Sequence, residues 1–329
     1  MPKDLLGIFV LTTLYCLQGI PMGLFWGSMP FLLANKFSYS DQATFSLSSY
    51  PFSLKLLWSP IVDSIYFIDY GRRKSWIFPC QMLMGIILIY MSYNLNEWIY
   101  NDTPDVYSLT LWCFILIFVT ATQDIAVDGW ALTILSDENV SYQSTCQSFG
   151  QTLGYAIGFP VFLVLNSDEI CSKYFGASKA LLTLDQFFLG CGVIVIVVNI
   201  LVTTFVPERK FTKKELIELN KLTVMGAYYE MIKVIKIKNV IKLCGILLTC
   251  KIGFCLVDSV TSLKLNQKGF PKETAGLMVF IYMPIEIISP LLIQYLRKSW
   301  LKDKMDLEIW KFGYILRLFL SFITIYMVS

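Results

Sequence analysis

The sequence predicts an all-α protein that crosses a membrane several times, and three observations lead to this class. Apolar residues make up 56% of the 329 residues and charged residues only 16%. The mean hydropathy is +0.60, which is high for a soluble domain. Apolar runs long enough to cross a bilayer as helices follow one another, and Lys and Arg gather in a few of the segments between them.

Composition also excludes several classes of function. The chain has no His, so no imidazole can bind a metal or relay a proton. Its nine Cys show no Cys-x-x-Cys spacing and several lie inside apolar runs, as buried thiols do. The net charge of +3 gives no basic character that would indicate nucleic acid, and the phosphate-loop, G-x-S-x-G and H-E-x-x-H patterns are missing. We therefore expect no enzyme, no metal and no cofactor.

Six apolar helices are expected before a charged segment, at about residues 5–33, 43–67, 76–93, 107–135, 143–165 and 187–206. The first is too long and too polar for a cleaved signal peptide. It is interrupted by Q-G-I-P-M-G at residues 18–23, where freed backbone groups need neighbouring helices or water. That interruption fits an ordinary kink or a substrate contact. The fifth helix carries Gly150, Gly154 and Gly158, an edge suited to close helix packing.

Three more apolar helices follow the charged segment, at about residues 240–263, 274–296 and from 309 onward. We expect residues 1–206 to form a six-helix half, residues 207–238 to form a cytosolic linker, and residues 239–329 to form part of a second half. The distribution of Lys and Arg over the loops favours a cytosolic N-terminus. Asn101 begins a glycosylation acceptor triplet and would then lie on the opposite side.

The acidic pair Asp124 and Asp128 is the most informative feature of the fourth helix. Residues four apart share one helix face, and each carboxylate at bilayer depth costs about 2.5–3.5 kcal/mol. This face must therefore meet protein or a water-filled path. It fits the wall of a transport cavity, a structural network between helices, or a position near the membrane interface. Gln123 precedes the pair, and Gln147 with Gln151 forms a polar strip on the fifth helix.

With the acidic pair, seven ionisable side chains fall inside the expected helices. Seven such charges against lipid, at about 3 kcal/mol each, would cost on the order of 20 kcal/mol, more than the roughly 5–15 kcal/mol of a protein's net stability. They must pair, cluster or face water. Lys55 could extend to the interface or face inward toward a carboxylate or an anion. Lys251 and Asp258 share one face of the seventh helix, while Glu286 lies on the eighth and Arg317 on the ninth.

The loop after the second helix contains Asp63 and the run G-R-R-K at residues 71–74. Three adjacent cations mark a cytosolic loop. The arrangement resembles the gating loop of the major facilitator superfamily, Gly-x-x-x-Asp-x-x-Gly-Arg-Arg/Lys, with a longer spacing between Asp63 and Gly71. The resemblance implies gating roles for Asp63, Gly71, Arg72 and Arg73.

Seven segments together carry a closer resemblance. They are Q-G-I-P-M-G-L, D-Q-A-T-F-S, P-F-S-L-K-L-L-W-S-P-I-V-D, G-R-R-K-S-W, T-Q-D-I-A-V-D-G-W-A-L, S-T-C-Q-S-F-G-Q-T-L-G-Y and K-I-G-F-C-L-V-D-S-V-T-S-L-K-L. They closely resemble the acetyl-coenzyme A transporter family of the endoplasmic reticulum membrane, within the major facilitator superfamily. The resemblance covers about residues 10–300, and bacterial muropeptide permeases are more distant relatives.

The resemblance implies a multi-pass protein that moves acetyl-coenzyme A from the cytosol into the lumen of the endoplasmic reticulum and Golgi, as a solute:proton symporter. Its partners would be acetyl-coenzyme A, the lipid bilayer and, where it assembles, further copies of itself. The family fold has twelve helices, whereas nine are expected in this sequence, which predicts a chain cut after the ninth helix. A non-transporting fragment or isoform, and a transporter of another large anion such as an amino-sugar peptide, are the alternatives.

In this fold the first, fourth, seventh and tenth helices line the cavity, which makes Lys251 the first choice for a contact with substrate phosphate. Its rival role is an ion pair with Asp258 or with the acidic pair. The expected cavity residues are Lys55, Gln123, Asp124, Asp128, Gln147, Gln151, Lys251, Asp258 and Arg317.

Overall fold

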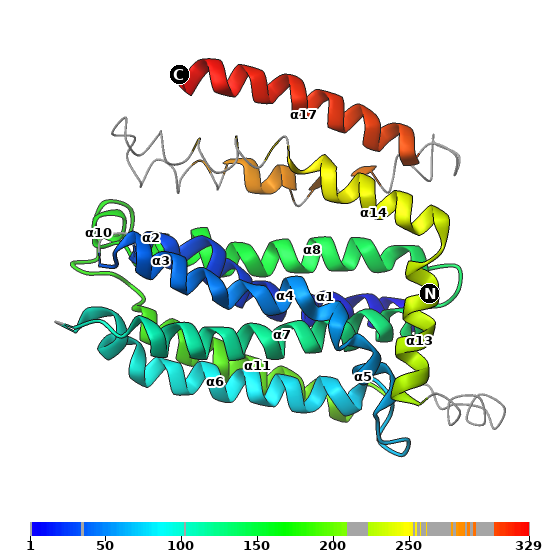
Figure 1. The fold of residues 1–329 in the computed structure, drawn as a ribbon. Helices are drawn as coiled ribbons and strands as arrows, with labels where there is room; N and C mark the ends of the chain where they lie inside the picture. Colours follow the sequence, from blue (N-terminus) through cyan, green and yellow to red (C-terminus); the bar gives the residue numbers. More distant parts are fainter. Residues whose placement is uncertain are drawn as a thin grey trace. The chain divides into compact units, whose positions relative to one another are not determined.

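The structure is a computed structural model, and it describes residues 2–33, 36–101, 103–208, 223–252 and 306–328, with residues 254, 257, 261, 278, 281–286, 288, 289, 292 and 293. Every regular element in these residues is a helix, as Figure 1 shows. The chain forms two compact units, Met1–Ala227 and Tyr228–Ser329. Five of the described helices are long and apolar enough to cross a membrane, so the predicted all-α, multi-pass class is confirmed.

The first span runs unbroken from Asp4 to Leu33. It consists of α1 (Pro2–Met22), the π-helical η1 (Gly23–Ser28) and α2 (Met29–Leu33). The expected interruption at residues 18–23 is thus a widening of the helix that begins at Gly23. Pro21 and Pro30 flank the π-helical turns. Because proline lacks an amide donor, each removes one hydrogen bond of the ordinary α-helical pattern.

The segment expected to form the second span, residues 43–67, is a series of short helices instead of one helix, and it is not among the five helices that are long and apolar enough to cross a membrane. It consists of α3 (Tyr39–Ser46), η2 (Leu47–Ser49), α4 (Tyr50–Leu54), η3 (Lys55–Leu57) and α5 (Ser59–Ser64). Pro51 and Pro60 stand in the first turns of α4 and α5, where the missing amide is tolerated but the preceding helix cannot continue. Lys55 therefore begins a short 3-10 turn inside this segment.

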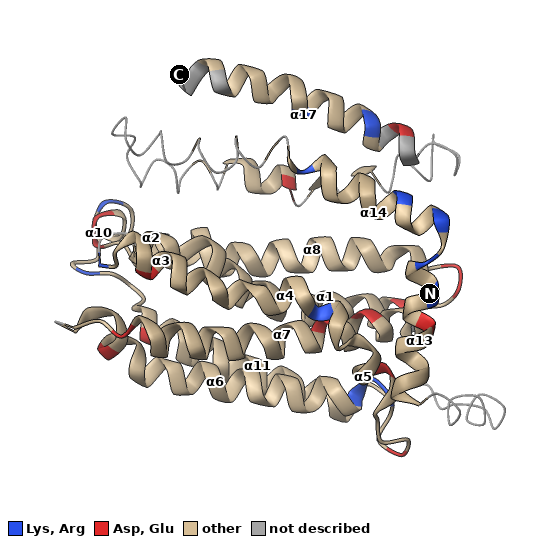
Figure 2. Cartoon of the chain, viewed as in Figure 1, with Lys and Arg blue, Asp and Glu red and all other residues tan. Residues whose placement is uncertain are grey.

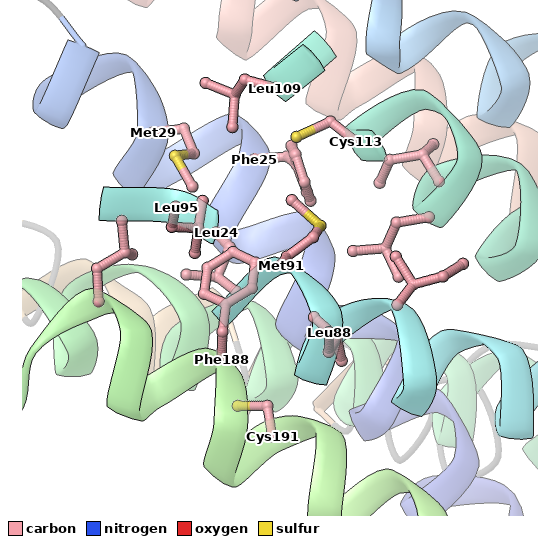
Figure 3. Close-up of a cluster of buried hydrophobic side chains, with 14 of the residues drawn as sticks. Leu24, Phe25, Met29, Leu88, Met91, Leu95, Leu109, Cys113, Phe188 and Cys191 are labelled. Atoms are coloured by element: carbon pink, nitrogen blue, oxygen red, sulfur yellow. The ribbon is translucent and has the colours of Figure 1, made fainter. Parts of the chain in front are cut away.

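The remaining spans of the first unit are α6 (Lys74–Tyr100), α7 (Val106–Ile134), the run of α8 (Gln143–Ala156), η5 (Ile157–Val161) and α9 (Phe162–Leu165), and α11 (Leu184–Phe205). Three of them lie close to their expected bounds, whereas α6 runs seven residues past its expected end at Tyr93. Short helices η4 (Val140–Tyr142) and α10 (Asp168–Phe175) occupy the connections. The apolar core of Figure 3 joins η1, α6, α7 and α11 through residues such as Leu24, Met91, Cys113 and Phe188.

Glycines allow α1 and α8 to pack with their backbones in contact. A Cβ on Gly154 would meet the Cys16 carbonyl oxygen, and one on Gly19 would meet the backbone of Gln151. The π-helical segments η1 and η5 also touch, because the Ser28 hydroxyl donates to the Gly158 carbonyl at 2.8 Å. The expected packing edge on the fifth helix is therefore present, and it holds α8 beside the first span.

The second unit is described only in part. The helix α13 (Val224–Ile235) lies inside the expected linker and spans the boundary between the units, and α14 (Lys238–Cys250) and α17 (Asp306–Val328) follow. The described residues between α14 and α17 are helical apart from Lys251, which is in a turn. Glu286 is exposed within the described part of the expected eighth helix.

Candidate functional site

A charged centre lies inside the first unit, where α7 meets the broken segment from α3 to α5. The Lys55 ammonium forms an ion pair with Asp124 Oδ2 and lies 4.0 Å from Asp128 Oδ2. The Asp124 side chain is fully buried, whereas those of Lys55 and Asp128 are 30% and 33% exposed. Figure 2 shows most charges at helix ends and in loops, with a small group inside this unit between α4 and α7. The acidic pair thus faces protein, and Lys55 faces inward.

Neutral side chains from α1 and α8 complete the contacts of the two carboxylates. The Tyr15 hydroxyl donates to Asp128 Oδ1 at 2.7 Å, and Gln147 Nε2 donates to the same oxygen at 3.3 Å. Gln151 Nε2 lies 3.3 Å from Asp124 Oδ1 and 3.4 Å from Gln18 Oε1. Three separate segments therefore hold the acidic pair of α7.

The break in this segment places Lys55 at this point. Its ammonium lies 4.8 Å from the centroid of the Phe52 ring, one turn earlier. After the 3-10 turn, Trp58 Nε1 donates to Thr122 Oγ1 at 3.1 Å, and the Trp58 ring packs on Phe118 with centroids 4.8 Å apart. These contacts fix the broken segment against α7 on both sides of the ammonium.

Sequence reasoning missed Tyr15, named Gln18 only as part of the interruption in the first helix, and included one residue that stands apart from the centre. Tyr15 and Gln18 lie three residues apart on α1, so a polar pair on one face of an apolar helix was the available signal. Gln123 is fully buried, and within the part of the chain that the structure describes neither of its side-chain polar atoms has a hydrogen-bond partner. It therefore does not contact the acidic pair through its amide.

The candidates of the second half lie in the second unit. Lys251 is exposed at the end of α14, and Asp258 lies outside the described residues. The Arg317 guanidinium on α17 lies 4.6 Å from the centroid of the Phe254 ring. The structure therefore does not test the pairing of Lys251 with Asp258.

The gating-loop candidates form a compact cluster of their own. Arg73 Nη1 lies 2.6 Å from Asp63 Oδ1, and Arg72 donates to the Asp63 carbonyl through Nη2 at 2.8 Å. Gly71 has φ +113°, which favours glycine. Burial, and then the neighbouring Arg73, lowers the pKa of the Arg72 guanidinium. The two side chains are only 18% and 12% exposed.

Glu208, just beyond α11, belongs to the same cluster. Sequence reasoning missed this role, because Glu208 lies past the apolar run of its helix and far in sequence from the loop. Its carboxylate accepts from the backbone amides of Arg73 at 3.0 Å and Lys74 at 3.1 Å. These amides begin α6, where a negative charge is favourable. Arg73 also packs on Gly129 of α7, since a Cβ there would meet its guanidinium. The loop is thereby tied to α5, α7 and the end of α11.

Fold and centre together define a helical membrane protein of several spans with a charged group inside its first unit. Among the residues that the structure describes, no three His, Cys, Asp or Glu side chains gather into a group that could hold a metal ion. The family model described as "Acetyl-coenzyme A transporter 1" matches residues 7–311. The chain belongs to this family, a family of membrane transporters.

Curated relatives agree with that assignment. An uncharacterized protein of Schizosaccharomyces pombe is 35% identical over 99% of this chain and 62% of its own length. An uncharacterized membrane protein of Saccharomyces cerevisiae is 35% identical over 92% of this chain and 61% of its own length. A putative transporter AmpG 4 of Rickettsia conorii is 31% identical over 46% of this chain and 36% of its own length. The chain spans about three fifths of the length of the two yeast relatives.

Proposed function

We propose that this protein transports acetyl-coenzyme A from the cytosol into the lumen of the endoplasmic reticulum, with the fold of the major facilitator superfamily. The family match over residues 7–311 supports the substrate. The observation that carries the proposal is the centre of Lys55, Asp124 and Asp128, which is buried at Asp124 and partly open at the other two side chains. A transport path needs such polar, partly accessible groups inside a helical bundle.

The balance of charge at this centre favours coupling to protons. Acetyl-coenzyme A brings a diphosphate and a 3′-phosphate, and Lys55 faces two carboxylates that outnumber it when both are ionised. A phosphate can approach the ammonium only when a carboxylate takes up a proton, because like charges repel strongly where water is scarce. Substrate and proton would therefore enter the centre together, as in a symporter.

The gating loop takes a supporting role in the proposal. Arg72 and Arg73 are engaged by Asp63, so they act as a closed clamp at the cytosolic end. Other cations would then attract the substrate.

The proposal places the N-terminus and residues 71–74 in the cytosol and Asn101 in the lumen. Labelling of single introduced cysteines by a reagent that cannot cross the membrane tests it, and lumenal labelling at residues 71–74 contradicts it.

Uptake into proteoliposomes tests the transport proposal. We expect saturable uptake of radiolabelled acetyl-coenzyme A that rises when the outside is made acidic, and weaker uptake of free coenzyme A. Asp128→Asn should remove the response to the proton gradient without reducing membrane insertion. The matched control is Asp137→Asn, in an exposed turn after α7, which should behave as the unaltered chain. Uptake no greater than in protein-free vesicles would contradict transport by this chain.

A second substrate class has its own support. The anhydromuropeptide permease of Escherichia coli is 23% identical over 43% of this chain and 28% of its own length. An amino-sugar peptide would also need polar groups on its path, although it carries no phosphate. Competition separates the two: acetyl-coenzyme A uptake unaffected by an excess of an anhydromuropeptide supports the first proposal. Uptake of the peptide in place of acetyl-coenzyme A supports the second, and uptake of neither supports a non-transporting fragment.

A further inference from the structure

Among the described residues, five buried side-chain polar atoms without hydrogen-bond partners belong to amides of α6, α7 and α11, and the other two are Gln18 Nε2 and Thr110 Oγ1. Gln81 of α6, Gln123 of α7 and Asn199 of α11 are all fully buried. Among the described residues, neither side-chain polar atom of Gln81 or Gln123 has a partner, and Asn199 lacks one for Oδ1. Buried polar atoms are nearly always hydrogen-bonded in folded proteins, to protein or to ordered water, so these atoms point to a bound molecule.

The packing of α6 on α7 brings the two glutamines to the same level. These helices run antiparallel, since the Asp105 amide at the start of α7 donates to the Trp98 carbonyl at the end of α6, at 3.0 Å. Further along, Thr120 Oγ1 lies 3.5 Å from Met84 Sδ. Gln81 is three residues before Met84 on α6, and Gln123 is three residues after Thr120 on α7. Because the helices are antiparallel, both residues lie one turn beyond this contact in the same direction, and their amides are opposite each other.

The third amide reaches the same level from α11. Asn199 Nδ2 donates to the Phe78 carbonyl at 3.0 Å, and Phe78 is three residues before Gln81 on α6. The next contact in this antiparallel pair, from Lys74 Nζ to the Thr203 carbonyl at 2.9 Å, fixes the direction of α11. The oxygen of Asn199 thus lies within one helical turn of the Gln81 amide.

We propose that Gln81, Gln123 and Asn199 form a water-binding site between α6, α7 and α11. The amide groups supply both donors and acceptors, and a buried water commonly makes about three hydrogen bonds. The five atoms without protein partners match one or two such waters, which would bridge the three helices. Because Gln123 directly precedes Asp124, the site lies beside the ion pair with Lys55 along α7.

Hydroxyl-radical labelling tests this site on the unaltered protein in nanodiscs. X-ray pulses generate radicals from bound water, and buried Met84 is well placed to be oxidised by them because it contacts Thr120 next to the amides. Met91 is the control within the same chain: it is also fully buried and lies seven residues further along the same face of α6, away from the three amides. In ¹⁸O-water, we expect at least fivefold more labelled sulfoxide at Met84 than at Met91.

The double variant Gln81→Leu with Gln123→Leu provides the second arm. Leucine fills similar space without polar atoms, so labelling at Met84 should fall to the level of Met91. Equal labelling of the two methionines in the unaltered chain would overturn the proposal, because the amides would then satisfy one another directly. Persistent Met84 labelling in a folded double variant would overturn it too. If the variant fails to fold, the comparison within the unaltered chain decides.

Discussion

Removing the charge of Lys55 should destabilise the first unit, because Asp124 would be left as a buried carboxylate without its cation. Lys55→Met keeps most of the length of the side chain and removes the ammonium, together with the contact between the ammonium and the Phe52 ring. Breaking a buried ion pair by deleting one partner costs roughly 3–5 kcal/mol. The lower end applies here, about 3 kcal/mol, because the Lys55 side chain is 30% exposed and Gln151 still donates to Asp124.

The loss is large enough to measure in detergent. For a unit of this size each kcal/mol shifts the melting temperature by about 2–4 °C, so Lys55→Met should lower it by about 6–12 °C. The assay is thermal unfolding of purified protein followed by intrinsic fluorescence. Lys179→Met is the matched control, since Lys179 is exposed in the connection before α11. It should shift the melting temperature by no more than about 2 °C.

A second substitution separates the loss of an ion pair from a loss of packing. Asp124→Asn leaves an amide that needs no counter-charge, so Lys55→Met with Asp124→Asn should recover most of the lost stability. A double variant as unstable as Lys55→Met alone would refute the assignment of the loss to an uncompensated carboxylate. So would a Lys55→Met variant whose melting temperature changes no more than that of Lys179→Met.

Two further substitutions test the packing and the helix ends. Gly154→Val should cost about 1–3 kcal/mol, because its side chain would meet the Cys16 carbonyl, whereas Gly190→Val, with open space around it, should unfold near the unaltered temperature. Asp105→Ala should cost about 1 kcal/mol by removing the cap that accepts from the Ser108 amide. Hydrogen bonds from Ser108 lower the pKa of Asp105. The stabilisation is therefore present above about pH 4, and melting curves of variant and unaltered chain should converge as the pH falls below that value.

The inward orientation of the acidic pair followed from the sequence because the cost of charge in lipid leaves few alternatives. Two carboxylates four residues apart must share a protein-lined or wet face, and the structure places Lys55, Tyr15 and Gln151 against them. Some helix bounds were equally accessible, such as the end of α11 before Pro207, whereas the end of α6 at Tyr100 lies seven residues beyond the expected one at Tyr93. The Gly154 edge followed from its spacing alone.

Other features depend on information that single-helix patterns do not carry. The break at Lys55 arises because Pro51 and Pro60 begin two short helices inside one apolar run, and hydropathy does not register this. Gln123 shares a helix with the acidic pair, but its angular position turns it from that face, and only the packing of the helices reveals this. Glu208 reaches the amides of α6 from a segment far away in sequence.

The partial exposure of the centre bears on whether it is a structural network or part of a transport path. A buried ion pair is weak evidence for stability, because well-packed apolar side chains often hold a protein together as well or better. The first unit already has such means, in the apolar core around Met91 and the close α1–α8 contact at Gly154. A network kept for structure alone would be expected to close over all its charges. Here Lys55 and Asp128 remain about one third exposed beside a fully buried Asp124. This asymmetry leaves one fully buried carboxylate beside two partly exposed charged groups, which is the arrangement that the proposed transport path requires.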